Sequence, residues 1–285
     1  MMAALTLQNW NLTIGDGKAL FCILGLNVIE DLDLALQTAT ELKQIADDLK
    51  LPFVFKASFD KANRSSINSF RGPGMAEGLK ILATVKDKLK VPIATDLHEP
   101  FQAEPVAEVA DLVQIPAFLV RQTDLIVATA RATQKNKGLL HVKKAQFLAP
   151  SDCKSILHKI EQAAAPNMTI LCERGSAFGY NNLIVDMLAI QEMQKFGVPV
   201  TIDATHAVQL PGAKAVEGGG VAAGGRREGV SVIAAAAIAA GADGVFLEFH
   251  PEPDKAKCDG PSCLPLSGAR ALLTRLKAIH AAARA

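Results

Sequence analysis

Short runs of apolar and β-branched residues alternate with longer amphipathic stretches along almost the whole chain. Continuous apolar runs of this kind are typical of parallel strands that are covered on both faces. We predict eight strands, at Leu20–Gly25, Phe53–Ser58, Pro92–Leu97, Leu112–Ile115, Leu139–Lys143, Met168–Cys172, Val198–Ala204 and Gly244–Glu248. We predict helices at Asp33–Leu49, Met75–Leu89, Gln122–Lys135, Ser151–Ala164, Leu183–Lys195, Gly229–Ala240 and Ser267–Ala283. This order favours an α/β fold, a closed (β/α)8 TIM barrel.

Three further features refine this fold prediction. The turn after the first strand, Gly25-Leu26-Asn27, lacks the glycine pattern of a nucleotide-binding doubly wound sheet. Leu5–Ile14 alternates enough to predict a short N-terminal β-hairpin that closes the amino-terminal mouth of the barrel. Six of the fifteen residues in Pro211–Gly225 are glycine, which predicts a mobile active-site loop. We find no linker or repeat, so we predict a single domain over residues 1–285.

Composition excludes several classes of function. The 30 basic and 29 acidic residues give a net charge of +1, which provides no electrostatic footprint for nucleic acid or for a membrane surface. No apolar stretch is long enough to span a bilayer, and the N-terminus lacks the pattern of a secretory signal. The five cysteines are scattered, and Cys258-x4-Cys263 has no second pair to complete a zinc site. We therefore expect a cytoplasmic protein with free thiols.

Basic residues gather at the predicted strand ends. In a barrel, the segments that follow the strands build the active site. Lys56, Lys61, Arg64, Lys143 and Arg174 all lie at such positions, in a chain that is otherwise electrically neutral. Any one of them taken alone could be a solvated surface charge. Together they predict a pocket for small molecules with several negative charges, because phosphates and carboxylates require several donors.

A second group of strand-end residues carries an imidazole and two carboxylates. His206 follows the seventh predicted strand, Glu248 ends the eighth, and Asp259 lies in the segment after it. Such a set can ligate a divalent metal, or it can act as acid, base and orienting partner. The spacing leaves both possibilities open.

Several contiguous motifs resemble one enzyme family. They are FVFKASFDKANRSS at 53–66, QIPAFL at 114–119, RQTD at 121–124, LCERGS at 171–176, FGY at 178–180 and KCDGPS at 257–262. Between Phe21 and Leu266 the chain resembles the 3-deoxy-D-manno-octulosonate 8-phosphate (KDO 8-phosphate) synthases. That family condenses phosphoenolpyruvate with arabinose 5-phosphate for lipopolysaccharide biosynthesis. The related synthases that use erythrose 4-phosphate lack the KANRSS run in its usual form.

The resemblance implies a role for each matching residue. The phosphoenolpyruvate phosphate would contact Lys143, Arg174 and the backbone near Ala117, and its carboxylate would contact Lys56, Ser58, Lys61 and Gln114. Arabinose 5-phosphate would contact Asn63, Arg64 and Ser65. Asp96, Phe118 and Gln146 complete the substrate-binding set. The catalytic set would be Asn27, Lys61, His206, Glu248, Cys258 and Asp259, and the family is typically a homotetramer.

The residue at position 27 bears on whether a metal is needed. The family has metal-dependent members, in which a Cys stands at this position and ligands match His206, Glu248 and Asp259. Here the position is Asn27, whose neutral oxygen is a poor ligand for a thiophilic ion. The Val208–Gly212 run resembles the metal-dependent members, whereas Cys258–Ser262 resembles the metal-independent ones. We predict that no metal or other cofactor is required.

Two other functions are compatible with parts of the pattern. Lys56 or Lys143 could form a Schiff base in an aldolase, although that chemistry needs a lysine of depressed pKa. A barrel that only senses a phosphorylated metabolite would need the cations, but it would not need His206, Glu248 and Asp259 together. Within the synthase hypothesis, the group that handles water or protons lies among Asn27, His206 and Asp259, with no single base chosen.

Overall fold

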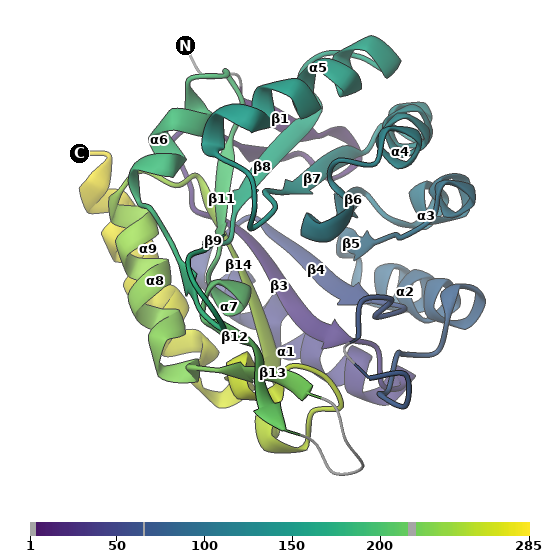
Figure 1. Cartoon of the computed structure of the whole chain (residues 1–285), viewed down its shortest axis with the longest axis vertical. Helices are drawn as coiled ribbons and strands as arrows, with labels where there is room; N and C mark the ends of the chain where they lie inside the picture. The colour runs from purple at the N-terminus through teal and green to yellow at the C-terminus, as the bar shows by residue number, and fades with distance from the viewer. Residues whose placement is uncertain (1–3, 65, 216–220) are drawn as a thin grey trace.

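The computed structural model describes residues 4–64, 66–215 and 221–285. Within these residues, eight parallel strands close into a barrel in the order β11-β8-β7-β6-β5-β4-β3-β14, and β11 pairs with β14 (Figure 1). The strands are β3 (Phe21–Val28), β4 (Phe53–Ser58), β5 (Ile93–Asp96), β6 (Leu112–Ile115), β7 (Leu139–Lys143), β8 (Thr169–Glu173), β11 (Val200–Asp203) and β14 (Gly244–His250). Every residue of these strands is buried, as continuous apolar runs predict. The predicted (β/α)8 barrel is confirmed.

Helices surround the barrel (Figure 1). They are α1 (Leu32–Leu49), α2 (Met75–Leu89), α3 (Ala103–Val109), α4 (Thr123–Lys135), α5 (Cys153–Ala163), α6 (Leu188–Gln194), α8 (Arg227–Ala239) and α9 (Ala269–Ala283). Each buries one apolar face, such as Leu42 and Ile45 of α1, in the same hydrophobic core as the strands. Local signals also set the helix ends: Asp31 accepts a hydrogen bond from the backbone N–H of Leu34 at the start of α1.

The N-terminal hairpin is also confirmed. β1 (Leu5–Leu7) pairs antiparallel with β2 (Leu12–Ile14), and Leu5, Leu7 and Ile14 are buried in the barrel core. The remaining short elements are the 3-10 helices η1 (Gln8–Trp10), η2 (Pro100–Gln102), η3 (Ala117–Leu119), η4 (Pro150–Asp152), η5 (Pro253–Lys255), η6 (Gly260–Ser262) and η7 (Leu266–Gly268), the helix α7 (Ala204–Ala207), and strands β9 (Ser176–Ala177), β10 (Leu183–Ile184) and β15 (Leu264–Pro265).

One predicted helix begins at a different residue and one short helix was not predicted. Most other predicted boundaries agree with the structure within two residues. The helix expected from Leu183 begins only at Leu188, and Leu183–Ile184 instead forms β10, which pairs with β9. Asp186 accepts a hydrogen bond from the backbone N–H of Leu188, so this side chain favours a helix start after it. The sequence analysis also missed α3, a helix of seven residues that is too short to show a clear period.

The described parts of the glycine-rich segment are more regular than predicted. Instead of an irregular loop, β12 (Gln209–Ala215) and β13 (Val221–Gly225) form an antiparallel ribbon. Residues 216–220 lie outside the described residues. The ladder is made by backbone groups, which glycine supplies as well as any residue, so side-chain periodicity did not reveal it.

A bulge near the end of β3 positions Asn27. Gly25 pairs with Lys56 and Val28 pairs with Ser58, so β3 carries one residue more than β4 between these pairs. A Cβ at Gly25 would lie 1.9 Å from the Lys56 carbonyl oxygen, so only glycine allows this approach of the two strands. The bulge therefore places Asn27 beside the residues at the ends of β4 and β14.

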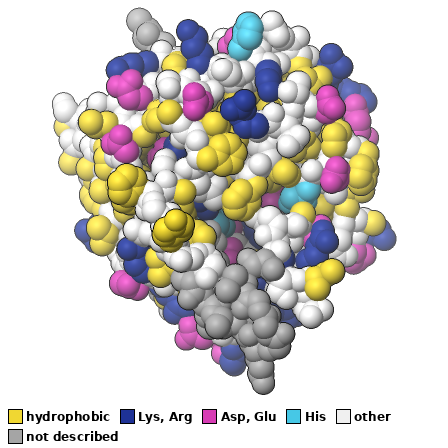
Figure 2. Space-filling view, viewed as in Figure 1, with side chains coloured by type: hydrophobic (Ala, Val, Ile, Leu, Met, Phe, Trp, Pro, Cys, Tyr) yellow, Lys and Arg dark blue, Asp and Glu magenta, His cyan; other side chains and the backbone are white. Residues whose placement is uncertain are grey.

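The face of the molecule shown in Figure 2 is mixed in charge. On the face shown in Figure 2, basic and acidic side chains are interspersed and do not form a patch of one sign, as the net charge of +1 predicts. In the described part of the chain, no helix combines the length and apolar character that crossing a membrane requires. The five cysteines are free and buried.

Candidate active site

A pocket of about 1020 Å³ opens at the carboxyl ends of the barrel strands. Of the predicted site residues, the following line it: Lys56, Lys61, Asn63, Arg64, Asp96, Gln114, Ala117, Phe118, Lys143, Gln146, Arg174, His206, Cys258 and Asp259. Asn27, Ser58 and Glu248 are buried and do not line it. Ser65 lies outside the described residues. Residues from distant parts of the sequence thus meet in one cavity, as a barrel requires.

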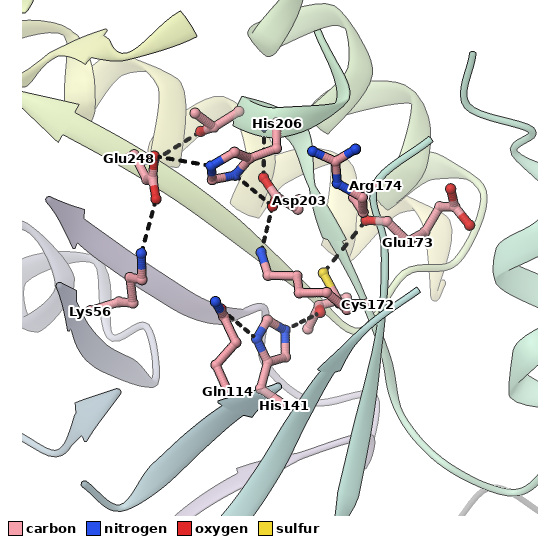
Figure 3. Close-up of polar contacts among 12 residues, drawn as sticks. Lys56, Gln114, His141, Cys172, Glu173, Arg174, Asp203, His206 and Glu248 are labelled. Carbon is pink, nitrogen blue, oxygen red and sulfur yellow. Dashed lines mark hydrogen bonds and ion pairs between the residues drawn. The ribbon is translucent and has the colours of Figure 1, made fainter. Parts of the chain in front are cut away.

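Lys56 of β4 and Glu248 of β14 form a buried ion pair. Lys56 Nζ lies 3.1 Å from Glu248 Oε1, and neither side chain is more than 1% exposed (Figure 3). Lys56 also donates to Ser58 Oγ at 2.9 Å. Burial and the neighbouring Lys61 charge lower the pKa of Lys56. Burial would raise the pKa of Glu248, but the charges of His206 and Lys56 lower it to about 2. Each charge therefore compensates the other inside the protein.

A second buried chain of charges joins Lys143, Asp203 and His206 (Figure 3 labels the last two residues). Lys143 Nζ donates to Asp203 Oδ2 at 2.5 Å, and His206 Nδ1 lies 2.7 Å from the same oxygen. Asp203 caps the N-terminus of α7 by accepting from the backbone N–H of His206, which explains the spacing of the two side chains. Burial would raise the pKa of Asp203, but His206 and Lys143 hold it well below its usual range. An ionised Asp203 favours a proton on His206 Nδ1.

Asn27 connects the two carboxylates of the predicted acid–base group. Its Nδ2 donates to Glu248 Oε2 at 2.6 Å and to Asp259 Oδ2 at 3.1 Å. The Nε2 atom of His206 lies 3.6 Å from Glu248 Oε2 and 3.7 Å from Asp259 Oδ2. The structure therefore brings together all four residues that bear on the metal question, and an amide N–H₂ group lies between the carboxylates.

Lys61 and Arg174 are two further buried cations of the pocket. Among the residues that the structure describes, neither forms an ion pair, although both are more than nine-tenths buried. Burial would lower the pKa of Lys61, but the carboxylates of Asp96 and Glu248 raise it above its usual value. Arg174 Nη2 donates to Gln209 Oε1 at 3.2 Å, whereas its buried Nη1 has no hydrogen-bond partner among the described residues. Buried charges of this kind favour an anionic ligand.

Arg64 and Cys258 lie at another side of the pocket. Arg64 Nη1 is 2.5 Å from Cys258 Sγ and 3.9 Å from Asp259 Oδ1. Burial, with the nearby Asp259 charge, raises the pKa of the Cys258 thiol to about 12. A neutral thiol is a poor nucleophile, so this environment favours a packing and hydrogen-bonding role for Cys258 over a covalent one.

The sequence analysis assigned no role to several residues of the site. Asp203 and His98 line the pocket. Asp203 lies near the end of the seventh predicted strand and His98 follows the third, so their position was a usable signal. His98 Nε2 lies 3.4 Å from Asp96 Oδ2. Gln209 also lines the pocket, but it carries no such signal, because it lies beyond α7 in the ribbon.

Comparisons with known proteins place the chain in a family. The model of the DAHP synthetase I family matches residues 3–282. The chain is 52% identical over 276 residues to the 2-dehydro-3-deoxyphosphooctonate aldolase of Stutzerimonas stutzeri (strain A1501), covering 97% of this chain and 95% of that protein. It is 50% identical over 278 residues to the protein of that name from Shewanella amazonensis, covering 98% and 95% of the two chains. The chain belongs to the DAHP synthetase I family and, within it, to the group of the 2-dehydro-3-deoxyphosphooctonate aldolases.

Proposed function

We propose that this protein is an enzyme that condenses phosphoenolpyruvate with D-arabinose 5-phosphate and water, giving 3-deoxy-D-manno-octulosonate 8-phosphate and phosphate. The relatives that carry the name 2-dehydro-3-deoxyphosphooctonate aldolase support this assignment. The observation that carries it is the pair of buried cations, Lys61 and Arg174, which form no ion pair with another described residue and lie in one pocket of about 1020 Å³. That volume accommodates two phosphorylated metabolites together. The product serves lipopolysaccharide biosynthesis.

The charges in the pocket suggest how the substrates are held. Arg174 and Lys143 bind the phosphate of phosphoenolpyruvate, and Lys61 and Gln114 bind its carboxylate. Lys56 supports this end through its bonds to Glu248 and Ser58 rather than as a free cation. Arabinose 5-phosphate binds beside Arg64 with Asn63 and Ser65, and the remaining contacts come from Asp96, Ala117, Phe118 and Gln146.

The proposed reaction forms one carbon–carbon bond at C3 and, at C2, replaces the carbon–oxygen bond to phosphate with a bond to the oxygen of water. C3 of phosphoenolpyruvate attacks the sugar aldehyde, whose oxygen takes up a proton, and positive charge develops at C2. Water adds to C2 and loses a proton, and the resulting hemiketal phosphate then expels phosphate as its C2–O bond breaks. Holding two anions in this geometry removes a large part of the barrier, at best about 7–11 kcal/mol.

His206 is placed to handle the proton of the attacking water. Its Nδ1 contacts the ionised Asp203, so Nε2 is the atom that exchanges protons in the pocket. Asp259 lies 3.7 Å from Nε2 and lines the same cavity, where it orients the water. Asn27 contacts Asp259 and Glu248 contacts His206, and these contacts hold the pair in position.

We propose that the reaction needs no metal ion. The four residues that match the metal-ligand positions of the metal-dependent family members are Asn27, His206, Glu248 and Asp259. Asn27 directs its N–H₂ group, a donor, at both carboxylates, and so satisfies oxygens that a cation would otherwise bind. This donor set does not fit a thiophilic divalent ion.

The direct test is phosphate release from phosphoenolpyruvate. Release should require arabinose 5-phosphate, and erythrose 4-phosphate should not replace it. Equal release with both sugars, or none with either, would contradict the proposed function. Borohydride trapping with a keto acid is the matched control for Schiff-base chemistry and should give no adduct.

We also propose a cytoplasmic homotetramer. The loops after β6, β7 and β8 carry large hydrophobic side chains that are more than half exposed, namely Phe118, Phe147, Phe178 and Tyr180. Exposed apolar groups of this size are typical of interfaces. Sedimentation equilibrium should give four times the mass of 30.1 kDa. A monomer at micromolar concentration would contradict this assembly.

A further inference from the structure

A hydrogen-bonded chain lies beside the proposed phosphoenolpyruvate position and joins three strands. His141 of β7 is the register neighbour of Gln114 of β6. Its Nδ1 lies 3.3 Å from Gln114 Oε1, and its Nε2 lies 2.9 Å from Thr201 Oγ1 of β11 (Figure 3 labels the first two residues). Gln114 lines the pocket, whereas His141 and Thr201 are fully buried and do not. His141 therefore acts on a ligand only through Gln114.

The surroundings keep the imidazole of His141 neutral. Burial, with the nearby Lys143 charge, holds its pKa well below its usual range. The ring stacks on Phe246, with centroids 6.0 Å apart and an angle of 16° between the planes. The charged groups that act on it are Lys143, Lys56 and Asp203. A neutral imidazole has one donor nitrogen and one acceptor nitrogen. His141 therefore donates one of its two hydrogen bonds and accepts the other.

Two arrangements of the protons are possible. In the first, the Thr201 hydroxyl donates to His141 Nε2, Nδ1–H donates to Gln114 Oε1, and the Gln114 N–H₂ group is available to the pocket. In the second, Thr201 donates to the Leu171 carbonyl at 3.3 Å, and His141 Nε2–H donates to Thr201. His141 Nδ1 is then an acceptor, so the Gln114 amide must turn and offer its oxygen to the pocket.

The charge of the pocket decides between them. The positive charges of Lys61 and Arg174 favour an anionic ligand in the pocket. The Gln114 amide oxygen would repel such an anion, whereas the Gln114 N–H₂ group would donate a hydrogen bond to it. We propose that His141, fixed in its Nδ1–H form by Thr201, is a positioning residue that orients Gln114 so that its N–H₂ group binds the carboxylate of phosphoenolpyruvate. This role rests on the proposed function for the identity of the substrate, but the tautomer of His141 does not depend on it.

Variants of Thr201 and His141 test the chain. Thr201→Val removes the hydroxyl with little change of shape and should raise the KM for phosphoenolpyruvate about tenfold. The kcat and the KM for arabinose 5-phosphate should change less than about threefold. Thr201→Ser keeps the hydroxyl and is the matched control, with kinetics near wild type.

A double-variant comparison separates positioning from packing. In His141→Asn, the side-chain N–H₂ can replace Nδ1–H as donor to Gln114 without help from Thr201. This variant should therefore retain the KM for phosphoenolpyruvate, and Thr201→Val should then have no further effect on it. If Thr201→Val acts only through packing, it raises KM equally in both backgrounds, which would overturn the proposal.

A spectroscopic measurement reads the tautomer directly. In protein labelled with ¹⁵N-histidine, long-range ¹H–¹⁵N spectra should show His141 as the Nδ1–H form, assigned by its loss in His141→Asn. An Nε2–H form would overturn the proposal even in an active enzyme. Phosphoenolpyruvate affinity measured by calorimetry replaces KM if the wild-type protein releases no phosphate, so failure of the proposed reaction remains distinguishable from failure of the positioning role.

Discussion

Asn27 donates a hydrogen bond from Nδ2 to Glu248 Oε2 at 2.6 Å, across 221 residues of sequence. The second proton of the same amide is directed at Asp259 Oδ2, at 3.1 Å. One neutral side chain thus separates two carboxylates that would repel each other. Hydrogen bonds within the chain therefore fix the positions of both carboxylates in this site.

Metal removal should leave activity unchanged. Because Asn27 satisfies both carboxylates as a donor, exhaustive treatment with EDTA should not lower the rate of phosphate release. Metal analysis of the purified protein is the control that removal was complete. Loss of activity that manganese or zinc restores would contradict the metal-independent proposal.

Removing a buried pocket cation that forms no ion pair with another described residue should impair catalysis strongly. Lys61→Met and Arg174→Met each delete a buried charge that has no ion-pair partner among the described residues, so the protein should fold while the substrate loses a counter-charge. We expect kcat/KM to fall about 30- to 1000-fold, as for loss of one partner of a buried charge pair. Lys154→Met, at an exposed position on α5, is the control and should be silent. A change below threefold in either pocket variant would show that the anion binds elsewhere.

Asp203→Asn should separate proton handling from binding. The amide can keep the shape of the side chain but cannot hold His206 Nδ1–H and Lys143 as a carboxylate does. We expect kcat to fall by about 10²–10⁴, with a smaller change in KM for either substrate. Circular dichroism should confirm folding.

Asp243→Asn is the matched control for that experiment. Asp243 is another buried carboxylate, but it lies at the amino end of β14 and contacts Arg284 and the backbone N–H of Val200. Its replacement should lower thermal stability without lowering kcat. If both variants lose kcat equally, the effect of Asp203 is structural rather than catalytic.

Stability should fall with acid through His280 of α9. Burial, with the nearby Arg284 charge, lowers the pKa of His280 from 6.5 to about 4. The unfolded chain therefore binds a proton below pH 6.5 that the folded protein takes up only near pH 4. The free energy of unfolding should decrease between pH 6.5 and 4, by at most about 3 kcal/mol from this residue.

Urea denaturation at a series of pH values measures this dependence. In His280→Gln the slope between pH 6.5 and 4 should become shallower, because the titrating group is gone. His158→Gln, on the exposed surface of α5, should leave the slope as in wild type. An unchanged slope in His280→Gln would assign the acid sensitivity to other groups.

The strand pattern could be predicted because buried parallel strands need continuous apolar runs. The limits of β4, β6 and β7 agree with the sequence prediction at both ends. The ribbon of β12 and β13 could not be predicted, because its pairing depends on backbone groups rather than on a side-chain period. The short helix α3 was missed for lack of length.

The chemistry of the site could be predicted from the sequence only in part. Strand-end position identified Lys56, Lys143 and Arg174 as equivalent cations. In the barrel they differ, since Lys56 pairs with Glu248 and Lys143 with Asp203, whereas Arg174 pairs with no carboxylate in the described part of the chain. Ion pairing depends on distances of a few ångströms between residues far apart in sequence, which no local pattern encodes.

Local sequence thus established the kind of elements, their order and the end of the barrel at which polar side chains gather, because periodicity and apolar content act over a few neighbouring residues. The closure of the barrel and the register between strands settled which side chains touch. Among these contacts are the hydrogen bonds from Asn27 to two carboxylates and the hydrogen bond between Thr201 and His141, which are 60 residues apart in the sequence. Hydrogen bonds and charge compensation act over short distances in space, so they exist only once the strands are paired.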